Sequence, residues 1–276
     1  MATTNTQEKF TRPFHHDSNR YWFGDRAPPP VNQVSVDESA HWLAMGWSDL
    51  WAAPRVSLSY GAVFVVTAYL IFFGLSAVGM ESLILPMTAG FMLVGPLAAV
   101  GLYEVSRRHA CAEDITLREA FATFFRRSDQ LLVVGLTLMV MMLAWFMVAL
   151  LIFASFYHSA PPSMDRFFSD ILMAPQAPLF LLVGTVVGGV IAAAVFTLTA
   201  ISVPMLVERD VSAVHAMACS VRAVSRNWKV MIGWAAMIVL VTGFGLATFF
   251  VGLAITLPLV GHATWHAYKA IIVDNG

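Results

Sequence analysis

The sequence predicts an all-α membrane protein with six transmembrane helices, arranged as three helical hairpins that are each preceded by an amphipathic interfacial helix on the cytoplasmic side. Two observations predict this class. Apolar residues make up 58% of the 276 residues and charged residues only 12%, whereas an average soluble domain has about 25% charged residues. Long runs without Asp, Glu, Lys or Arg also recur between residues 56 and 273. These charges are too few to cover the surface of a soluble domain.

The N-terminal arm, residues 1–37, is polar and precedes the transmembrane domain, residues 38–276. It contains the proline run Pro28 to Pro30 and lacks the apolar core of a secretory signal peptide. Its low apolar content predicts disorder in isolation. We therefore expect the first span to act as the insertion signal.

Six stretches have the length of a transmembrane helix, because a bilayer core of about 30 Å requires about 20 helical residues. They are residues 56–79, 82–103, 131–157, 179–207, 230–248 and 250–269. The last two share an uncharged run of 39 residues, 230–268, which at 1.5 Å per residue spans roughly two bilayer cores. We place the turn between Gly243 and Gly252, because glycine tolerates a tight turn.

The cationic residues predict the orientation. Of the 16 Lys and Arg residues, all but Arg166 fall in the N-terminal arm, in the connections after the second and fourth spans, or at the C-terminal end. Cytoplasmic loops of membrane proteins carry such an excess of Lys and Arg. The pattern predicts an inner-membrane protein with both termini in the cytoplasm. In a five-span alternative, only Lys269 would change sides.

A short amphipathic segment precedes each pair of spans, at residues 39–53, 116–126 and 212–226. Apolar residues recur in them at helical spacing, and helices of this kind lie in the membrane interface. The side chains that we expect at the interface are Trp42, Trp47, Trp51, Phe121, Phe124 and, in the last span, Trp265. In the second segment, Thr116 and Glu119 have the spacing of a capping box. In the third, the expected apolar face comprises Val214, Met217, Val221 and Val224.

Each even-numbered span also carries a proline, namely Pro96, Pro204 and Pro258. An interfacial helix followed by a helical hairpin would then be the unit of a threefold repeat. The alternative is that any cytoplasmic connection of moderate length looks amphipathic. The fourth span contains Gly184, Gly188 and Gly189. Because small residues let helices approach closely in lipid, this span is a candidate for the centre of the bundle.

Two histidines in the last span are the candidate metal ligands. His262 and His266 are four residues apart, so they lie on one helix face and could place two imidazoles on one metal ion or haem. No Cys or Glu is placed by sequence to complete such a site. A structural hydrogen-bonding role, or a position at the membrane interface, is the alternative interpretation.

Other chemistry has little support in the sequence. The spans contain no Asp, Glu, Lys or Arg away from their ends, which argues against an ion-coupled pump. Glu104 and Glu208 lie next to basic residues at the cytoplasmic edge, and we interpret them as charges at the membrane interface. No nucleotide-binding or hydrolase motif is present, so we expect no enzymatic activity and no cofactor. A net charge of −1 argues against nucleic acid as a partner.

Several motifs resemble a bacterial family of uncharacterised integral membrane proteins, best known from alphaproteobacteria. They are GWSDLW at 46–51, VGPL at 94–97, GLYEVSRR at 101–108, PMLVERDV at 204–211, SVRAV at 220–224 and LPLVGHATWHAY at 257–268. The family is a domain of unknown function, some of whose members carry a label as cytochrome c oxidase subunits. The catalytic oxidase subunit has twelve helices and six His ligands, so the resemblance implies at most an accessory protein near a respiratory complex.

Three hypotheses for function follow. The first is an accessory or scaffold protein that contacts the lipid bilayer and other membrane proteins, including a respiratory complex. The second is a permease or channel for a small solute, which predicts a polar-lined cavity through the bundle. The third is a metal binder or membrane enzyme that uses His262 and His266. The absence of buried charge and of catalytic motifs favours the first.

Overall fold

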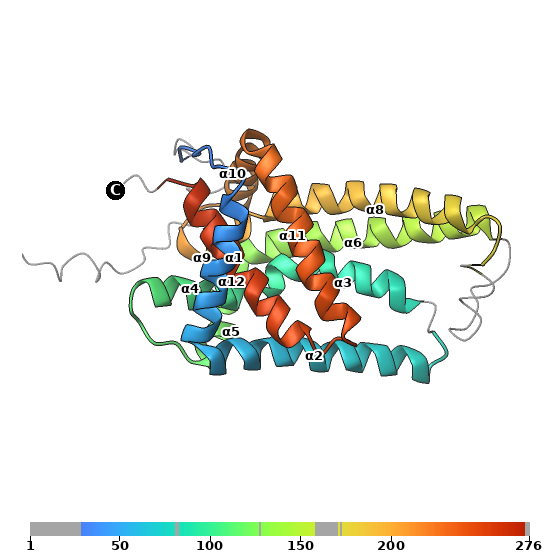
Figure 1. Ribbon diagram of the computed structural model, residues 1–276, viewed down its shortest axis with the longest axis horizontal. Coiled ribbons are helices and arrows are strands. Elements are labelled where there is room, and N and C mark those ends of the chain that lie inside the picture. The colour runs from blue at the N-terminus through green and yellow to red at the C-terminus, as the bar shows by residue number, and fades with distance from the viewer. Residues whose placement is uncertain (1–28, 81–82, 127, 158–170, 172, 274–276) are drawn as a thin grey trace, which may run out of the picture.

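The computed structural model describes residues 29–80, 83–126, 128–157, 171 and 173–273, and no β-strand occurs among them (Figure 1). The first five helices are α1 (Glu38–Ala52), α2 (Pro54–Ala77), α3 (Ile84–Ala98), α4 (Val100–Ala110) and α5 (Leu117–Arg126). They are followed by α6 (Ser128–Phe156), α8 (Ala177–Thr199), α9 (Ser202–Glu208), α10 (Ala213–Arg226), α11 (Trp228–Ala247) and α12 (Leu253–Ile271). The predicted all-helical class is confirmed for this part of the chain.

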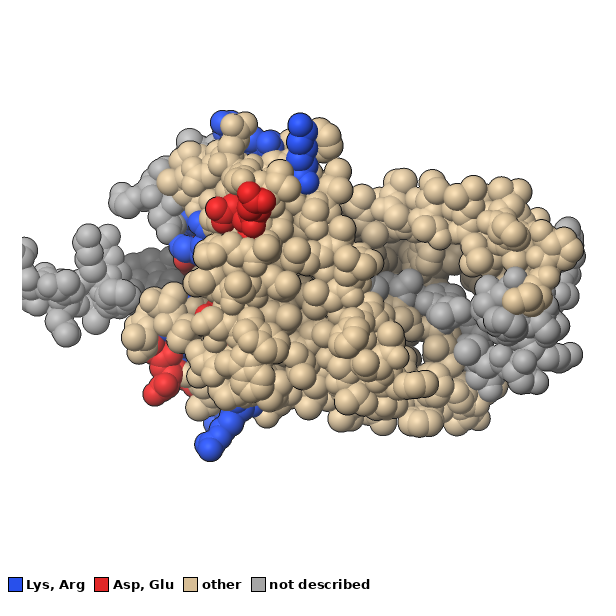
Figure 2. Space-filling model, in the orientation of Figure 1, with Lys and Arg blue, Asp and Glu red and all other residues tan. Residues whose placement is uncertain are grey.

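The molecule is elongated and has two unlike ends (Figure 1). Helices α1, α4, α5, α9 and α10 gather at one end together with the C-terminal half of α12, and we call this the charged end. From it, α2 runs toward the far end and α3 returns; α6 and α8 make a second such pair, which we call the outer hairpin. Among the described residues on this face, Lys, Arg, Asp and Glu lie at the charged end, and the tan surface of the opposite part has none of them (Figure 2).

Within the described part of the chain, four stretches are long and apolar enough to cross a membrane: Pro54–Ala77, Asp129–Phe156, Ala177–Glu208 and Trp228–Ala247. The predicted spans at 82–103 and 250–269 are not among them. Helix α3 has only 15 residues, and α12 carries two histidines and Lys269, which lower its hydropathy. The multi-pass character of the chain thus rests on four helices.

Two predicted spans are interrupted within a few residues of a proline. After Pro96, α3 ends at Ala98, and the Tyr60 hydroxyl on α2 donates to the Ala98 carbonyl oxygen at 2.8 Å and accepts from the Gly101 N–H at 3.3 Å. A neighbouring helix therefore satisfies the backbone groups at the break, as a site without water requires.

The break between α8 and α9, before Pro204, is repaired in the same way. The Ser220 hydroxyl of α10 donates to the Thr197 carbonyl oxygen at 2.7 Å and accepts from the Ile201 N–H at 3.2 Å. These two backbone groups are four residues apart and would bond each other in a continuous helix. The hydroxyl of Ser220 thus replaces one helical hydrogen bond.

The predicted turn between Gly243 and Gly252 is confirmed, because α11 ends at Ala247 and α12 begins at Leu253. The expectation that glycine makes the turn is wrong. Within this turn, the residues with positive φ are Phe249 and Phe250, at 52° and 67°. Gly245 and Gly252 instead pack against each other, since a Cβ on Gly252 would lie 2.9 Å from the Gly245 Cα.

The fourth predicted span does not lie at the centre of the bundle. In α6 and α8, only 6% of the residues in the most apolar stretch are buried, against 17% in α2 and 22% in α11. Gly188 packs on Trp145 of α6, but a Cβ on Gly184 or Gly189 would meet no atom within 4 Å. The small residues of α8 therefore face outward more than inward.

The short helices have the predicted places and partly the predicted faces. The capping box of α5 is confirmed: the Thr116 N–H donates to Glu119 Oε2 at 2.9 Å, and the Glu119 N–H donates to Thr116 Oγ1 at 3.3 Å. In α10, by contrast, Val214 and Val221 of the expected apolar face are exposed. Its buried face consists of smaller residues, because only these fit against α8 and α9: Ala213, Ala216, Cys219, Ser220 and Ala223.

Both ends of the described chain meet at the charged end. Val31 and Ile272 form an antiparallel bridge, and the Asn32 N–H donates to the Ile271 carbonyl oxygen at 2.8 Å. The side chain of Asn227 bonds the backbone of Asn32 and Val34. Residues 31 and 272 therefore lie on the same side of the helical bundle.

Candidate functional site

Five polar side chains form a cluster at the charged end, where α1, α2, α4 and α12 meet. They are Asp49 of α1, Ser57 of α2, Ser106 of α4, and His262 and His266 of α12. The packing of α1 on α12 brings them together. A Cβ on Gly46 would lie 2.6 Å from the Ala263 backbone nitrogen, so only glycine permits this approach. Asp49 and His266 each follow that contact by one helical turn.

The cluster is one continuous chain of hydrogen bonds. Ser57 Oγ lies 2.9 Å from His262 Nε2, and His262 Nδ1 lies 2.8 Å from Ser106 Oγ. The Ser106 hydroxyl donates to Asp49 Oδ2 at 2.6 Å, and the same oxygen lies 2.8 Å from His266 Nε2. The order is therefore Ser57, His262, Ser106, Asp49, His266.

The hydrogen-bond directions determine the tautomer of His262. Ser106 has one hydroxyl proton, which it donates to the Asp49 carboxylate, so it must accept from His262 Nδ1–H. A neutral His262 then accepts from the Ser57 hydroxyl through Nε2. This assignment gives both ring nitrogens a partner, as a fully buried histidine requires.

The charge of the cluster resides on Asp49, whose side chain is buried. Burial raises the pKa of Asp49, but the hydrogen bonds from His266 and Ser106 outweigh it, so the pKa lies below its usual value of 3.8. His109 of α4 lies 3.8 Å from the second carboxylate oxygen. Asp49 is thus an anion enclosed by imidazoles and a hydroxyl.

The two candidate metal ligands have different hydrogen-bond partners in the structure. His262 points to two serines and His266 to Asp49, so their bonded nitrogens do not converge on one point. Within the described ranges, no group of three or more His, Cys, Asp or Glu side chains is placed to hold a metal ion. The arrangement supports the hydrogen-bonding interpretation of the two histidines. Sequence analysis did not identify the other three members of the cluster, which are Asp49, Ser57 and Ser106.

The expected interface residues occupy three environments. Trp47 and Trp51 are exposed on α1 with ring centroids 5.6 Å apart, whereas Phe121 and Phe124 are half-buried on α5. Protein atoms cover Trp42 and Trp265 almost completely, and the interface position of all six residues stays a prediction. Trp42, only 1% exposed, packs edge-on against Trp234 of α11, because α1 is covered by α11 and α12 on that side.

Glu104 and Glu208, expected as interface charges, are held in ion pairs. Glu104 is buried and accepts from Arg107 Nε at 2.7 Å and Arg108 Nε at 3.0 Å. Burial raises the pKa of Glu104, but the effect of these two arginines is larger, so the pKa lies below its usual value. Glu208 pairs with Lys269 at 2.9 Å and accepts from the Tyr268 hydroxyl. The Glu208 pair fastens α12 to α9, and Arg108, which also pairs with Glu119 at 3.2 Å, joins α4 to α5.

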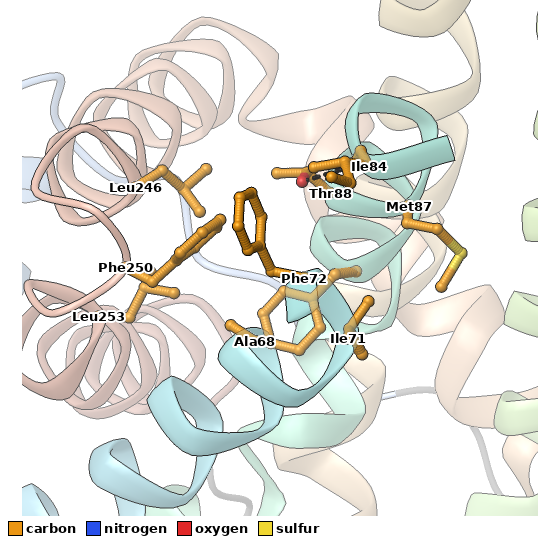
Figure 3. Close-up of a pocket in the computed structure, with 10 residues that line it drawn as sticks. Ala68, Ile71, Phe72, Ile84, Met87, Thr88, Leu246, Phe250 and Leu253 are labelled. Carbon is orange, nitrogen blue, oxygen red and sulfur yellow. Dashed lines mark hydrogen bonds between the residues drawn. The ribbon is translucent and has the colours of Figure 1, made fainter. Parts of the chain in front are cut away.

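Two hollows lie away from the cluster. The larger is an open cleft of about 490 Å³ among α2, α3, α4, α5 and α6, with Tyr60 as its hydroxyl-bearing residue. The smaller has about 30 Å³ and lies among α2, α3, α11 and α12, where Phe72 and Phe250 face each other (Figure 3). None of the five cluster residues lines either hollow, so neither gives a substrate access to them.

The comparisons with known proteins match one part of the chain. Residues 84–208 match the model of a family described as "Predicted integral membrane protein (DUF2189)". This segment runs from α3 to α9 and is similar to a membrane family of unknown function, as the sequence motifs suggested. No curated protein and no solved structure matches the chain.

Proposed function

We propose that this protein is a non-catalytic accessory component of a bacterial inner membrane that associates laterally with other membrane proteins. The observation that carries the proposal is the contrast between its polar and apolar groups. The polar cluster is satisfied within the chain and adjoins neither hollow, whereas the outer hairpin leaves most of its apolar surface uncovered.

The proposal includes six spans with both termini in the cytoplasm. Between the apolar helices α2 and α6 the chain returns to the charged end through α3 and α4, and after α11 it returns through α12 (Figure 1). An even number of crossings is supported by the bridge between Val31 and Ile272. The cytoplasmic position of this end is supported by its Lys and Arg residues.

Helix α8 has the surface best suited to a protein partner. Leu182, Val186, Gly189 and Ala193 lie on one exposed face at helical spacing. Gly189 and Ala193 are four residues apart, and small residues at this spacing let a second helix approach closely in lipid. A partner helix therefore has a defined place to pack, which a face of large branched residues would not provide.

Site-specific photocrosslinking in native membranes tests the proposal. Benzoylphenylalanine replaces Val186 or Ala193 on α8 and, as a matched control, the exposed Leu70 on α2. We expect a discrete adduct of constant mass from both α8 positions and none from position 70. Mass spectrometry of the adduct identifies the partner, and respiratory subunits would support the association implied by the family resemblance. Absence of an α8 adduct, or equal adducts from all three positions, would contradict lateral association through this face.

The permease hypothesis has weaker support. It predicts a polar-lined passage through the bundle, but the open cleft is lined by apolar side chains except for Tyr60. The hydroxyl of Tyr60 is itself bonded to the α3–α4 break. A cleft of this composition suits an apolar occupant from the bilayer better than a solute in transit.

A further inference from the structure

The cleft beneath α5 has the size and chemistry of a ligand site. Its volume of about 490 Å³ lies within the range of about 300–1,000 Å³ for small-molecule sites. Phe121 stacks on Tyr60 at its inner end, with ring centroids 4.4 Å apart and planes inclined by 13°. Leu132, Gly135 and Met139 line its wall along α6.

The position of the cleft points to an occupant that comes from the bilayer. Its walls include α2 and α6, both of which are long and apolar enough to span a membrane. An open cleft between two such helices faces hydrocarbon, and water inside it would find few hydrogen-bond partners. A saturated or unsaturated acyl chain matches a lining of this kind.

Helix α5, which closes the cleft at the charged end, supplies a cation for a headgroup. Arg118 is exposed, lies three residues before Phe121, and pairs with no acidic residue within the described part of the chain. Phe125, seven residues after Arg118 and so on the same helix side, is 75% exposed. A phenylalanine and an arginine placed together on an interfacial helix suit the boundary between acyl chains and phosphates.

We propose that the cleft holds one acyl chain of an anionic phospholipid, with the lipid phosphate against Arg118. The charge complementarity selects a phospholipid of the leaflet that adjoins the charged end, since juxtamembrane cations attract anionic headgroups. The acyl chain fills the space between α2, α5 and α6, so that α5 packs on the two spanning helices through the lipid. This inference is independent of any protein partner on α8.

Native mass spectrometry of the full-length protein tests the site. The protein is delipidated in mild detergent and then exposed to mixed vesicles of phosphatidylglycerol and phosphatidylcholine. We expect one retained phosphatidylglycerol per chain. Gly135→Phe fills the cleft without a backbone clash, because a Cβ at this position would be 3.7 Å from the nearest side-chain atom. This variant should reduce lipid retention about tenfold, because displacing two methylene groups of the acyl chain from the cleft already lowers the affinity by about that factor.

The matched control is Gly233→Phe, the same change at an open position on α11, which should retain lipid as the wild type does. Arg118→Gln should lower the preference for phosphatidylglycerol over phosphatidylcholine about fivefold. If Gly135→Phe does not accumulate as folded protein, Met139→Trp fills the same wall from one turn further along α6. Variable lipid stoichiometry, unchanged retention in the filled variant, or equal binding of oleate in place of phosphatidylglycerol would each overturn the proposal.

Discussion

Leu102 on α4 and Leu182 on α8 are the same residue in similar helices, yet the first is 0% exposed and the second 60%. Leu102 belongs to the charged end, where helices cross closely and polar groups bond one another. Leu182 belongs to the outer hairpin, whose apolar surface has no cover from its own chain. The charged end is held by intramolecular contacts, as in a soluble protein, whereas the hairpin depends on lipid or a partner for its surroundings. Substitutions at the charged end and in the outer hairpin should therefore have unlike effects.

Loss of the Asp49 carboxylate should have the largest effect. Asp49→Ala leaves Ser106 and His266 without their acceptor in a buried site, and breaking such a pair costs about 3–5 kcal/mol in free energy of unfolding. Denaturant titration in detergent micelles, followed by circular dichroism, measures the loss. The control is Asp37→Ala on the exposed surface before α1, which should change the stability by less than about 0.5 kcal/mol. Equal stability of the two variants would show that the cluster does not hold the helices together.

Acid should weaken the charged end through the same carboxylate. Burial raises the pKa of Asp49, but the hydrogen bonds from His266 and Ser106 bring it below 3.8, so the folded state binds this proton less readily than the unfolded state. The stabilisation is therefore complete above the unfolded pKa of about 3.9 and is lost as the pH falls through the folded pKa.

A comparison of wild type with Asp49→Asn isolates this contribution. We expect the free energy of unfolding of the wild type to fall more steeply below about pH 4 than that of the variant. Glu104, whose pKa is also lowered by Arg107 and Arg108, contributes with the same sign in both proteins and cancels in the difference. Parallel curves would mean that Asp49 gains nothing from its partners.

Gly46→Ala should destabilise by about 1–3 kcal/mol, because the added methyl group would lie 2.6 Å from the Ala263 backbone and push α1 away from α12. The same substitution at Gly189 meets no atom and should instead stabilise α8 by up to about 1 kcal/mol through helix propensity. Thermal unfolding in detergent compares the pair. Effects of the same sign would place Gly189 in contact with a neighbour in the micelle.

The sequence predicted what depends on local pattern. The all-helical class, the α5 capping box and the turn before α12 follow from hydropathy runs and from spacings of a few residues. The spacing of His262 and His266 also placed both histidines on one face correctly. The breaks beside Pro96 and Pro204 were missed, because prolines are tolerated within membrane helices when a neighbour supplies hydrogen bonds.

The cluster could not be predicted, because its members come from four distant helices. Ser106 is 57 residues from Asp49 and 156 from His262 in the sequence. One local signal was present: Asp49 lies seven residues after Trp42 and so on the apolar face of its helix. A carboxylate on an apolar face needs a buried partner, and this would have indicated that this face of α1 packs against other helices.

Leu182→Ala should have the smallest effect on the purified protein, less than about 0.5 kcal/mol, because the leucine exchanges contact with lipid or detergent and no cavity forms. The matched change Leu102→Ala should cost about 2–5 kcal/mol, since it empties a packed site. In native membranes we expect the opposite order for the association proposed through α8. Leu182→Ala should lower the yield of the photocrosslinked adduct from position 186. Leu102→Ala should leave that yield unchanged as long as the protein stays folded. A large loss of stability from Leu182→Ala in detergent would mean that the hairpin is already packed against a second copy of the chain, and the uncovered face of α8 would then be a contact within an oligomer.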